Sequence, residues 1–411
     1  MKLLTFLGTG NYAQTTYTWE DQEVTTKYVA AAINEFFAID TVQAFLTTEA
    51  RDTHWMMFSK AVKNAEEVFI PSGRSEEELW QIFEAVVNAV EPGETIVLDV
   101  THSFRSIPLF VFLAGTYLQK SRNVKIGGVY YGAYERDRPR SPIFDLTPTL
   151  KFIDWLTATD KFLDTGSAKD LGQLLTNIQS DFYKQGRQKR EPVSPKKLSE
   201  FGSKIKAISA SIELARPLKL MEETARLEGI AYEDLQADVG AFAQPFALLL
   251  DRIQTDYRQF AMQNPREASR RETLNKQVDL LGWYIDKSLT AQAILLAREL
   301  TISLLCFGLQ FDYLTKSNRD EVVAGLHTLI EWQKNTEELC PVFVQNLISL
   351  MPDLDLEWLS GFWSQLRDVR NDLAHTEMRL DSLSADKMSQ FASKEKLLYE
   401  INKLANFCQK R

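Results

Sequence analysis

The hydrophobic pattern of this chain changes once, near Pro148, and that change limits the folds available to it. Before it, short β-rich runs alternate with segments of helical spacing. The β-rich runs are KLLTFLG, VQAFLTT, EVFIP, TIVLDV and VKIGGVYYG, and the helical segments lie at about 28–37, 54–63, 76–90 and 104–120. Strands that alternate with helices are typical of a parallel sheet covered on both faces. We therefore expect a Rossmann-like α/β domain over residues 1–150.

After Pro148 the strand signals stop, and apolar residues recur at i, i+3 and i+4, as in packed amphipathic helices. We expect a helical linker over 151–205 and an all-α domain over 206–411. Within the linker, KQGRQKREPVSPKKLSE at 184–200 is rich in Lys and Arg, contains two prolines and lacks apolar periodicity. This favours an exposed loop, which is either a solvated connection or a basic patch that guides RNA.

Composition narrows the classes of partner. Apolar residues make up 45% and charged residues 25% of the chain, which fits a soluble globular protein of two or three domains. The formal net charge is −9, so a nucleic-acid site must be a local basic patch, and DNA is not an expected partner. Cys306, Cys340 and Cys408 show no metal-ligand spacing, so we expect no bound metal, no disulfide and a cytoplasmic location. The apolar run 291–311 is interrupted by Arg298 and its neighbour, so no membrane contact is expected.

Glycines follow the first predicted strand, in the stretch Gly8, Thr9, Gly10, Asn11. Ligands of open α/β sheets bind beyond the carboxyl ends of the strands, where glycines let the backbone approach and free N–H groups can hold phosphate oxygens. The stretch formally matches the dinucleotide fingerprint G-x-G-x-x-A. The acidic residue expected about twenty positions on is missing, however, because Asp40 precedes the second strand. The pattern indicates a tight turn or a phosphate cradle and disfavours a dinucleotide cofactor.

A second polar cluster follows the predicted strand TIVLDV and comprises Asp99, Thr101, His102, Ser103 and Arg105. Thr101 or Ser103 can cap the apolar helix that comes next, leaving N–H groups and hydroxyls directed at the same region as the glycines. Such a region suits an anionic or ribose-bearing ligand. The alternative is structural, with Ser103 as a cap, Asp99 bonded to a neighbouring amide and His102 on the surface.

This cluster resembles the D-x-T-H-G signature of accessory proteins of type III CRISPR systems, which carry an N-terminal CARF domain, a Rossmann-like sensor of cyclic oligoadenylates. The resemblance covers roughly the first 165 residues and extends to the stretches Gly8-Thr9-Gly10-Asn11, Tyr131-Gly132-Ala133 and Phe144-Asp145-Leu146-Thr147. Ser103 departs from it, since the family usually has glycine there.

The resemblance implies a homodimer or higher homo-oligomer in which two copies of this sheet end face each other and hold one ring-shaped ligand. It favours cyclic tetra-adenylate as that ligand, an allosteric activator rather than a cofactor. The ligand-binding residues it implies are Gly8, Thr9, Gly10, Asn11, Asp99, Thr101, His102, Ser103, Arg105 and Tyr131.

The stretch RNDLAH near the end of the chain contains Arg370, Asn371 and His375. The preceding residues place an apolar stripe on one helical face, namely Leu359, Phe362, Leu366, Val369 and Leu373. On a regular helix Arg370 and His375 diverge by about 140°, so one unbroken helix cannot converge all three polar side chains. A complete site needs a bend, a helix start or a second subunit.

The three side chains suit RNA cleavage without a metal. Histidine can take the proton of a ribose 2′-hydroxyl or give one to the leaving 5′-oxygen, and arginine can hold the scissile phosphate. Arg-Asn-x3-His also resembles the R-x4-6-H motif of HEPN ribonucleases. This implies a pair of HEPN domains, each contributing Arg370, Asn371 and His375, that cleave single-stranded RNA to a 2′,3′-cyclic phosphate and a 5′-hydroxyl.

The sequence thus predicts an endoribonuclease activated by a cyclic oligoadenylate. Two alternatives remain: a sensor without RNA chemistry, whose helical half is an interaction module, and a sensor that cleaves its own ligand with the help of Thr9, Asn11 or Ser103. The other histidines receive no role. His54 is expected at the surface or in packing, and His327, flanked by apolar residues, in the core.

Overall fold

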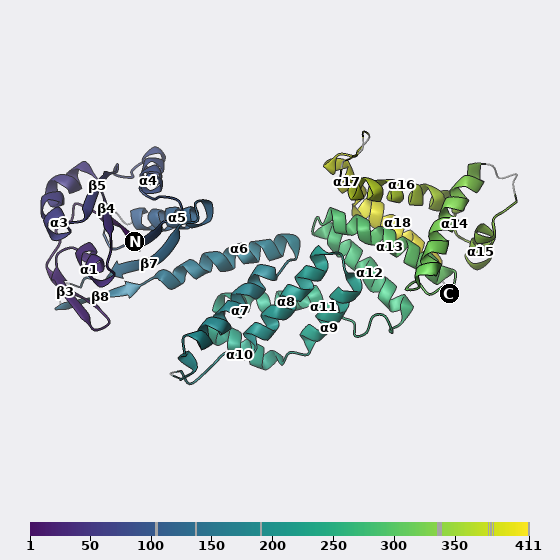
Figure 1. The fold of residues 1–411 in the computed structure, drawn as a ribbon, viewed down its shortest axis with the longest axis horizontal. Coiled ribbons are helices and arrows are strands. Elements are labelled where there is room, and N and C mark those ends of the chain that lie inside the picture. The colour runs from purple at the N-terminus through teal and green to yellow at the C-terminus, as the bar shows by residue number, and fades with distance from the viewer. Residues whose placement is uncertain are drawn as a thin grey trace. The chain divides into compact units, whose positions relative to one another are not determined.

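The computed structural model describes residues 1–102, 106–135, 138–189, 191–334, 339–376, 378, 380 and 382–409. These form two compact units, Met1–Asp154 and Trp155–Arg411 (Figure 1). The first contains strands and helices, and the second is helical throughout the described residues. The predicted fold class, an α/β domain followed by an all-α region, is confirmed.

The first unit is built on one eight-stranded sheet with the order β3-β2-β8-β7-β6-β1-β4-β5. The strands are β1 Lys2–Leu7, β2 Thr15–Trp19, β3 Gln22–Thr26, β4 Thr41–Leu46, β5 Ala65–Phe69, β6 Thr95–Asp99, β7 Lys125–Gly132 and β8 Arg140–Asp145. The five strands from β7 to β5 are parallel, as expected. β8 is antiparallel to β7 and β3 is antiparallel to β2, so the sheet is mixed rather than wholly parallel.

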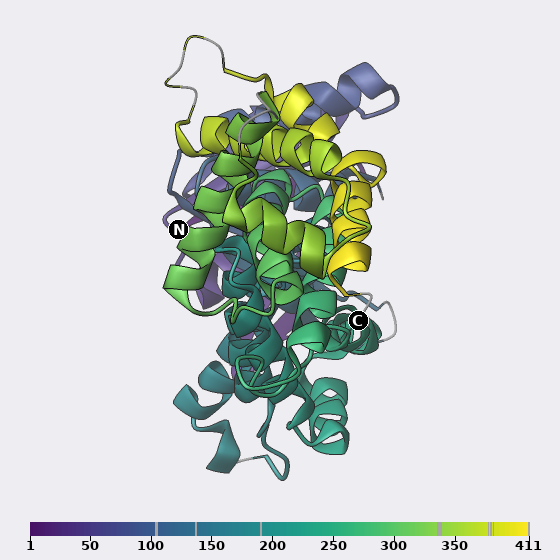
Figure 2. The same cartoon turned by 90° about the vertical axis from the view of Figure 1, so that its right-hand side faces the viewer.

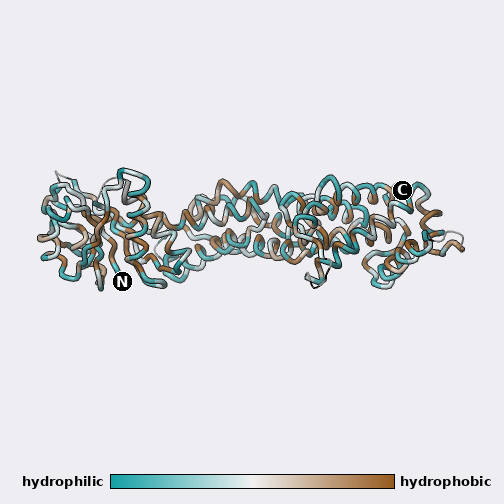
Figure 3. Tube along the Cα trace, turned by 90° about the horizontal axis from the view of Figure 1, so that it is seen from above, coloured by the Kyte–Doolittle hydropathy of each residue, from teal (hydrophilic) through white to brown (hydrophobic). Residues whose placement is uncertain are grey.

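Helices cover both faces of this sheet, which makes three layers (Figure 1). The helices are α1 Val29–Phe36, α2 Thr48–Ala50, α3 Met56–Ala61, α4 Glu76–Asn88 and α5 Ser106–Ser121. One core joins α1 and α3 to alternate residues such as Leu3, and the other joins α4 and α5 to alternate residues such as Leu4. This is the consequence of side chains that point to opposite faces along a strand. Hydrophobic segments accordingly concentrate along the strands in Figure 3.

The second unit packs its helices around a single hydrophobic core, seen end-on in Figure 2 with the last helices in green and yellow. The helices are α6 Leu150–Thr165, α7 Lys169–Lys184, α8 Leu198–Glu213, α9 Pro217–Glu228, α10 Tyr232–Phe242, α11 Gln244–Arg258, α12 Arg270–Asp286, α13 Thr290–Gly308, α14 Lys316–Lys334, α15 Val342–Leu350, α16 Leu356–Ala374, α17 Ala385–Phe391 and α18 Tyr399–Cys408. Among the described residues, α13 alone has the length and composition of a membrane span. It packs against α12, α14, α16 and α18 and is mostly buried, as expected for a core helix.

Glycines bring α7 and α8 into close contact. A Cβ atom added to Gly202 would lie 2.5 Å from the carbonyl oxygen of Gly172, and one added to Gly172 would meet the carbonyl oxygen of Gly202. Backbone atoms cannot move aside as a flexible side chain can. The Gly172–Gly202 contact therefore fixes the α7–α8 hairpin, which belongs to the second unit.

We predict that Gly202→Ala destabilises the helical unit by about 1–3 kcal/mol, because it overpacks a backbone contact. Gly361→Ala in α16 is the matched control. No described atom lies within 4 Å of the added methyl there, and alanine is the better helix former by about 1 kcal/mol. Thermal unfolding followed by far-ultraviolet circular dichroism should show a lower midpoint for Gly202→Ala and an equal or higher one for Gly361→Ala. Equal midpoints for both would contradict the contact.

Candidate functional site

The first candidate site lies where the strand order reverses. The chain runs from β1 to β4 and β5 on one side and returns to β6 and β7 on the other, so β1 and β6 flank the switch point. At such a point the two loops leave the sheet in opposite directions and open a crevice. Rings of the two loops meet there, with the Tyr12 and His102 centroids 4.3 Å apart. The two polar clusters predicted from sequence are therefore brought together.

The loop after β1 closes on itself through Tyr12. The Gly8 amide donates to the Tyr12 hydroxyl oxygen at 2.7 Å, and that hydroxyl donates to the Gly8 carbonyl at 3.2 Å. The expectation of a free Gly8 amide is therefore wrong. Thr9, Gly10 and Asn11 are exposed, and an added Cβ at Gly10 would meet no described atom within 4 Å. The open part of the loop is thus 9–11.

A cluster of aromatic rings packs against this loop and supports it. Tyr12 lies between His102 and His54, whose ring centroids are 4.3 and 4.5 Å away, and Tyr28 meets it edge-on at 5.7 Å. Burial raises the pKa of Tyr12 to about 12. His54 is buried and its Nε2 bonds the Gly10 carbonyl at 2.8 Å, so it packs as expected and also fixes the loop. Sequence reasoning gave Tyr12, Tyr28 and His54 no place in the site.

The loop after β6 is held by Asp99 and Thr101. The buried Asp99 carboxylate accepts from the Thr5 hydroxyl at 2.6 Å and from the Thr101 amide at 3.0 Å. The Thr101 hydroxyl accepts from the Gly132 amide at 2.8 Å. These bonds join the ends of β1, β6 and β7. Asp99 therefore bonds the neighbouring amide that the structural alternative expected, and the Thr101 hydroxyl bonds β7.

In the described part of this loop, His102 has a ring nitrogen without a hydrogen-bond partner. Burial lowers its pKa below the ordinary 6.5, against the opposing effect of the Asp99 charge, so the ring is neutral at neutral pH. Its Nε2 is buried and has no hydrogen-bond partner among the described residues. A neutral imidazole nitrogen beside the exposed loop can bond a ligand hydroxyl or phosphate. Ser103 and Arg105 lie outside the described residues.

Tyr131 lies on a different surface. It is 40% exposed at the end of β7 and lines an open apolar depression of about 600 Å³. The other lining residues are Val100, Phe112, Val129, Leu146, Thr149, Phe152 and Ile153. We call this the Tyr131 surface. A separate pocket of about 400 Å³ is lined by Asn11, Tyr12, Tyr28 and His54, together with Lys27.

The second candidate site is the end of α16. The helix begins with Asp355, whose side chain accepts from the Trp358 amide, and runs unbroken to Ala374. Its predicted apolar face is correct: Leu359, Phe362, Leu366 and Val369 are buried and Leu373 packs against the core. His375 is the C-cap, its N–H bonds the Asn371 carbonyl at 2.9 Å, and Thr376 follows with φ +48°.

The three polar side chains of this site form a pair and a separate imidazole. Arg370 Nη1 donates to the Asn371 side-chain oxygen at 3.1 Å, and Arg370 Nε is buried without a partner among the described residues. The His375 side chain is exposed and bonds none of the described residues. Next to the pair, buried Asp372 accepts from the Leu383 amide at 2.7 Å and fixes the returning chain. Within one chain, the Arg370 side chain is therefore held by Asn371, but the His375 side chain is not bonded to it.

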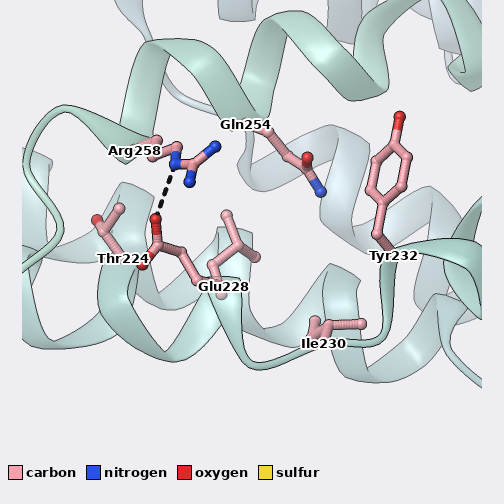
Figure 4. Close-up of a pocket in the computed structure, with 7 residues that line it drawn as sticks. Thr224, Glu228, Ile230, Tyr232, Gln254 and Arg258 are labelled. Atoms are coloured by element: carbon pink, nitrogen blue, oxygen red, sulfur yellow. Dashed lines mark ion pairs between the residues drawn. The ribbon is translucent and has the colours of Figure 1, made fainter.

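Other features of the described residues give weaker evidence of a functional site. His327, expected in the core, is exposed on α14, so that expectation is wrong. A pocket of about 440 Å³ lies among α9, α10 and α11, but its Arg258 is paired with Glu228 at 3.0 Å (Figure 4). Within the described ranges, no group of three or more His, Cys, Asp or Glu side chains is placed to hold a metal ion.

The chain thus combines a Rossmann-like domain with a helical unit. The loops of the first domain meet at the switch point, where domains of this class bind ligands. Residues 2–135 match the family model of the CARF domain of the CRISPR system endoribonuclease Csx1. Residues 151–266 match that of the second domain of CRISPR-associated protein MJ1674. Residues 2–135 are thus similar to a CARF domain, in line with the resemblance of the D-x-T-H motif.

Two individual proteins are similar to the chain. CRISPR-associated protein MJ1674 of Methanocaldococcus jannaschii is 29% identical over 182 residues, which are 43% of this chain and 25% of that protein. The chain thus matches about a quarter of the length of this curated relative. The structure of Enterococcus italicus Csm6 bound to cyclic hexa-2′-fluoro-hexa-dAMP has a TM-score of 0.46 and 12% identity, covering 100% of this chain and 94% of that one.

Proposed function

We propose that this protein is a single-strand-specific endoribonuclease of type III CRISPR immunity that a cyclic oligoadenylate activates. The observation that carries the proposal is the end of α16, where an exposed histidine follows a half-buried arginine held by asparagine, in a protein whose N-terminal domain is a CARF domain. We infer that these three residues provide proton transfer next to a fixed positive charge.

The residues of α16 divide the chemistry among them. His375, exposed at the helix end, takes the proton from a ribose 2′-hydroxyl as its oxygen attacks the adjacent phosphorus, or gives a proton to the departing 5′-oxygen. Arg370 stabilises the charge that grows on the phosphoryl oxygens, and Asn371 holds the guanidinium in place. The products are a 2′,3′-cyclic phosphate and a 5′-hydroxyl, and the reaction needs no metal ion.

The proposed site is composite. Within one chain the His375 side chain is not bonded to Arg370 or Asn371, so a second copy supplies the complementary group across a two-fold axis. The first unit offers a matching surface, because Phe152 at 63% and Tyr131 at 40% are exposed on the Tyr131 surface. Exposed apolar patches of this kind mark sites of association.

The proposed activator is a cyclic oligoadenylate, with four adenylates in the ring. Exposed Thr9 and Asn11 supply polar contacts for ribose and phosphate groups, and the buried Nε2 of His102 reaches a ligand only after the loop moves. The ring activates cleavage only if it binds the active arrangement of the helical pair more tightly than the inactive one. The sensor without RNA chemistry is the outcome in which the ring binds and no RNA is cut.

We predict that purified protein cleaves labelled single-stranded RNA about 10- to 100-fold faster with cyclic tetra-adenylate than without it, the usual range of allosteric coupling. Cyclic hexa-adenylate is the control for ring size, and excess EDTA the control for metal dependence. The 3′ ends should be cyclic phosphates, detected by resistance to phosphatase before acid treatment. Equal cleavage with and without the ring would reject the proposal.

A further inference from the structure

The strongest positive charge of the chain lies outside both candidate sites. Residues 184–206, which we call the basic segment, contain eight Lys or Arg and two Glu, a net charge of +6 in a chain of net charge −9. The rest of the chain is therefore strongly acidic and repels polyanions. A polyanion that approaches this protein is drawn to the basic segment.

The basic segment is anchored by its backbone. It joins α7 to α8, and buried Asp238 of α10 accepts from the amides of Lys196 and Lys197, both at 2.6 Å. The Tyr183 hydroxyl donates to the Pro195 carbonyl at 3.1 Å, before α8 begins at Leu198. In a flexible linker, these backbone amides and this carbonyl would bond water instead. Fixing the backbone lowers the conformational entropy lost when the side chains bind a partner.

Its charges exceed the acidic groups available to pair with them. Glu191 pairs with Arg187 at 2.6 Å, and Glu200 is shared by Lys197 and Lys204. Lys184 and Lys196 are exposed and form no ion pair with a described residue. These free ammonium groups stand at the two ends of the loop, one closing α7 and the other preceding α8.

Aromatic rings accompany the cations. Tyr183, beside Lys184, is 41% exposed. The Arg187 guanidinium lies over the Phe182 ring at 5.0 Å, but that ring is buried, so of these two rings Tyr183 is the one open to a base. Cations that follow a phosphate backbone and rings on which bases stack are the two components of single-strand binding surfaces. An acidic protein partner would use the cations alone, whereas RNA would also use the exposed face of the Tyr183 ring, whose hydroxyl bonds Pro195.

We infer that the basic segment is a second contact for single-stranded RNA, which holds the strand by its phosphates while α16 cuts it. The inference rests on the proposed function for its choice of RNA. Contacts of this kind are independent of base sequence and weaken steeply with salt. The basic segment therefore sets how tightly RNA is held and leaves the cleavage step unchanged.

The test is RNA binding by the full chain as a function of salt, in a His375→Ala background that preserves the RNA. Lys184→Gln with Lys196→Gln should weaken binding of a labelled single-stranded RNA about 10-fold. It should also reduce the slope of log affinity against log salt by about 1.4, since each lost phosphate contact removes about 0.7. The matched control is Lys169→Gln with Lys316→Gln, two exposed lysines without ion pairs to described residues, which should leave both quantities near those of the parent.

Equal losses in the two double variants would overturn the inference, because net charge alone would then explain them. Binding to vesicles of anionic lipid with no binding to RNA would also overturn it, in favour of a membrane surface. In the active protein, the basic-segment variant should raise KM and keep kcat. If the parent binds RNA through the basic segment but does not cut it with the ring, the proposed function fails and the inference stands.

Discussion

Replacing His375 with alanine is expected to lower the rate of RNA cleavage by about 10²- to 10⁴-fold, the contribution of a positioned general acid or base. The imidazole is exposed at the end of α16 and bonds no described residue, so its loss should leave the fold and the ring affinity unchanged. The measurement is the single-turnover rate with cyclic tetra-adenylate, together with ring binding by calorimetry. Wild-type cleavage by the variant would reject the proposed site.

The chain offers a matched control in His327, which is exposed on α14 in the same helical unit. His327→Ala removes the same ring from a helix surface and should cleave RNA at the wild-type rate. If both alanine variants lose activity equally, the loss reports a general effect on the helical unit rather than proton transfer at the end of α16.

Mixing two inactive variants tests whether the site is shared. Arg370→Ala and His375→Ala each lack one group, and a mixed dimer of the two has one site with both groups intact if these come from opposite subunits. Activity should then recover to roughly a quarter of wild type, since half of the dimers are mixed and each has one working site. No recovery on mixing would place both groups of a site on the same chain.

The sequence was informative about this site because helix geometry is regular. The five-residue separation of Arg370 and His375 predicted that one helix could not bring them together, and α16 is unbroken to Ala374, with the two side chains unbonded. The bond from Arg370 to Asn371 and the anchoring of the returning chain by Asp372 were not predictable. Both depend on side-chain rotamers and on a tertiary contact that no local pattern encodes.

The sheet shows the same division. Central strands such as β1 and β6 are apolar runs buried on both faces, so periodicity found them. β2 and β3 escaped because TTYTW and QEVTT are rich in threonine and only partly buried, and β8 because its sequence begins RSP. Strands that are rich in polar residues and only partly buried lack a continuous apolar signal.

The loops at the switch point were located from the ends of the strands, but the groups that support them were not. Tyr28 and His54 come from segments 16 and 42 residues beyond Tyr12, and they reach its ring only when β1, α1 and the start of α3 are packed on one face. Asp99 matched a ligand-binding motif, whereas its carboxylate is occupied by Thr5 and Thr101. A motif identifies the position of a residue and leaves open whether the residue contacts the ligand or supports the loop that does.

Asp99→Ala should therefore destabilise the first unit, Met1–Asp154, by about 2–4 kcal/mol. Two hydrogen bonds to a buried charged group are lost, and the Thr5 hydroxyl and the Thr101 amide are left unpaired, at about 1–3 kcal/mol for each unsatisfied group. Ring binding should weaken as well, because the ends of β1 and β6 are no longer joined. The measurement is the thermal unfolding of the first unit in the full chain, with ring affinity read on the same samples.

Asp99→Asn separates support of the loop from contact with the ligand. Asparagine keeps one oxygen for the Thr101 amide and can donate its NH₂ to the Thr5 hydroxyl oxygen, so both contacts survive at a cost of about 1 kcal/mol. If Asp99 acts through the loop, this variant should unfold and bind the ring nearly as wild type does. A stable Asp99→Asn protein that no longer binds the ring would show instead that the carboxylate meets the ligand, which requires its bonds to Thr5 and Thr101 to break on binding.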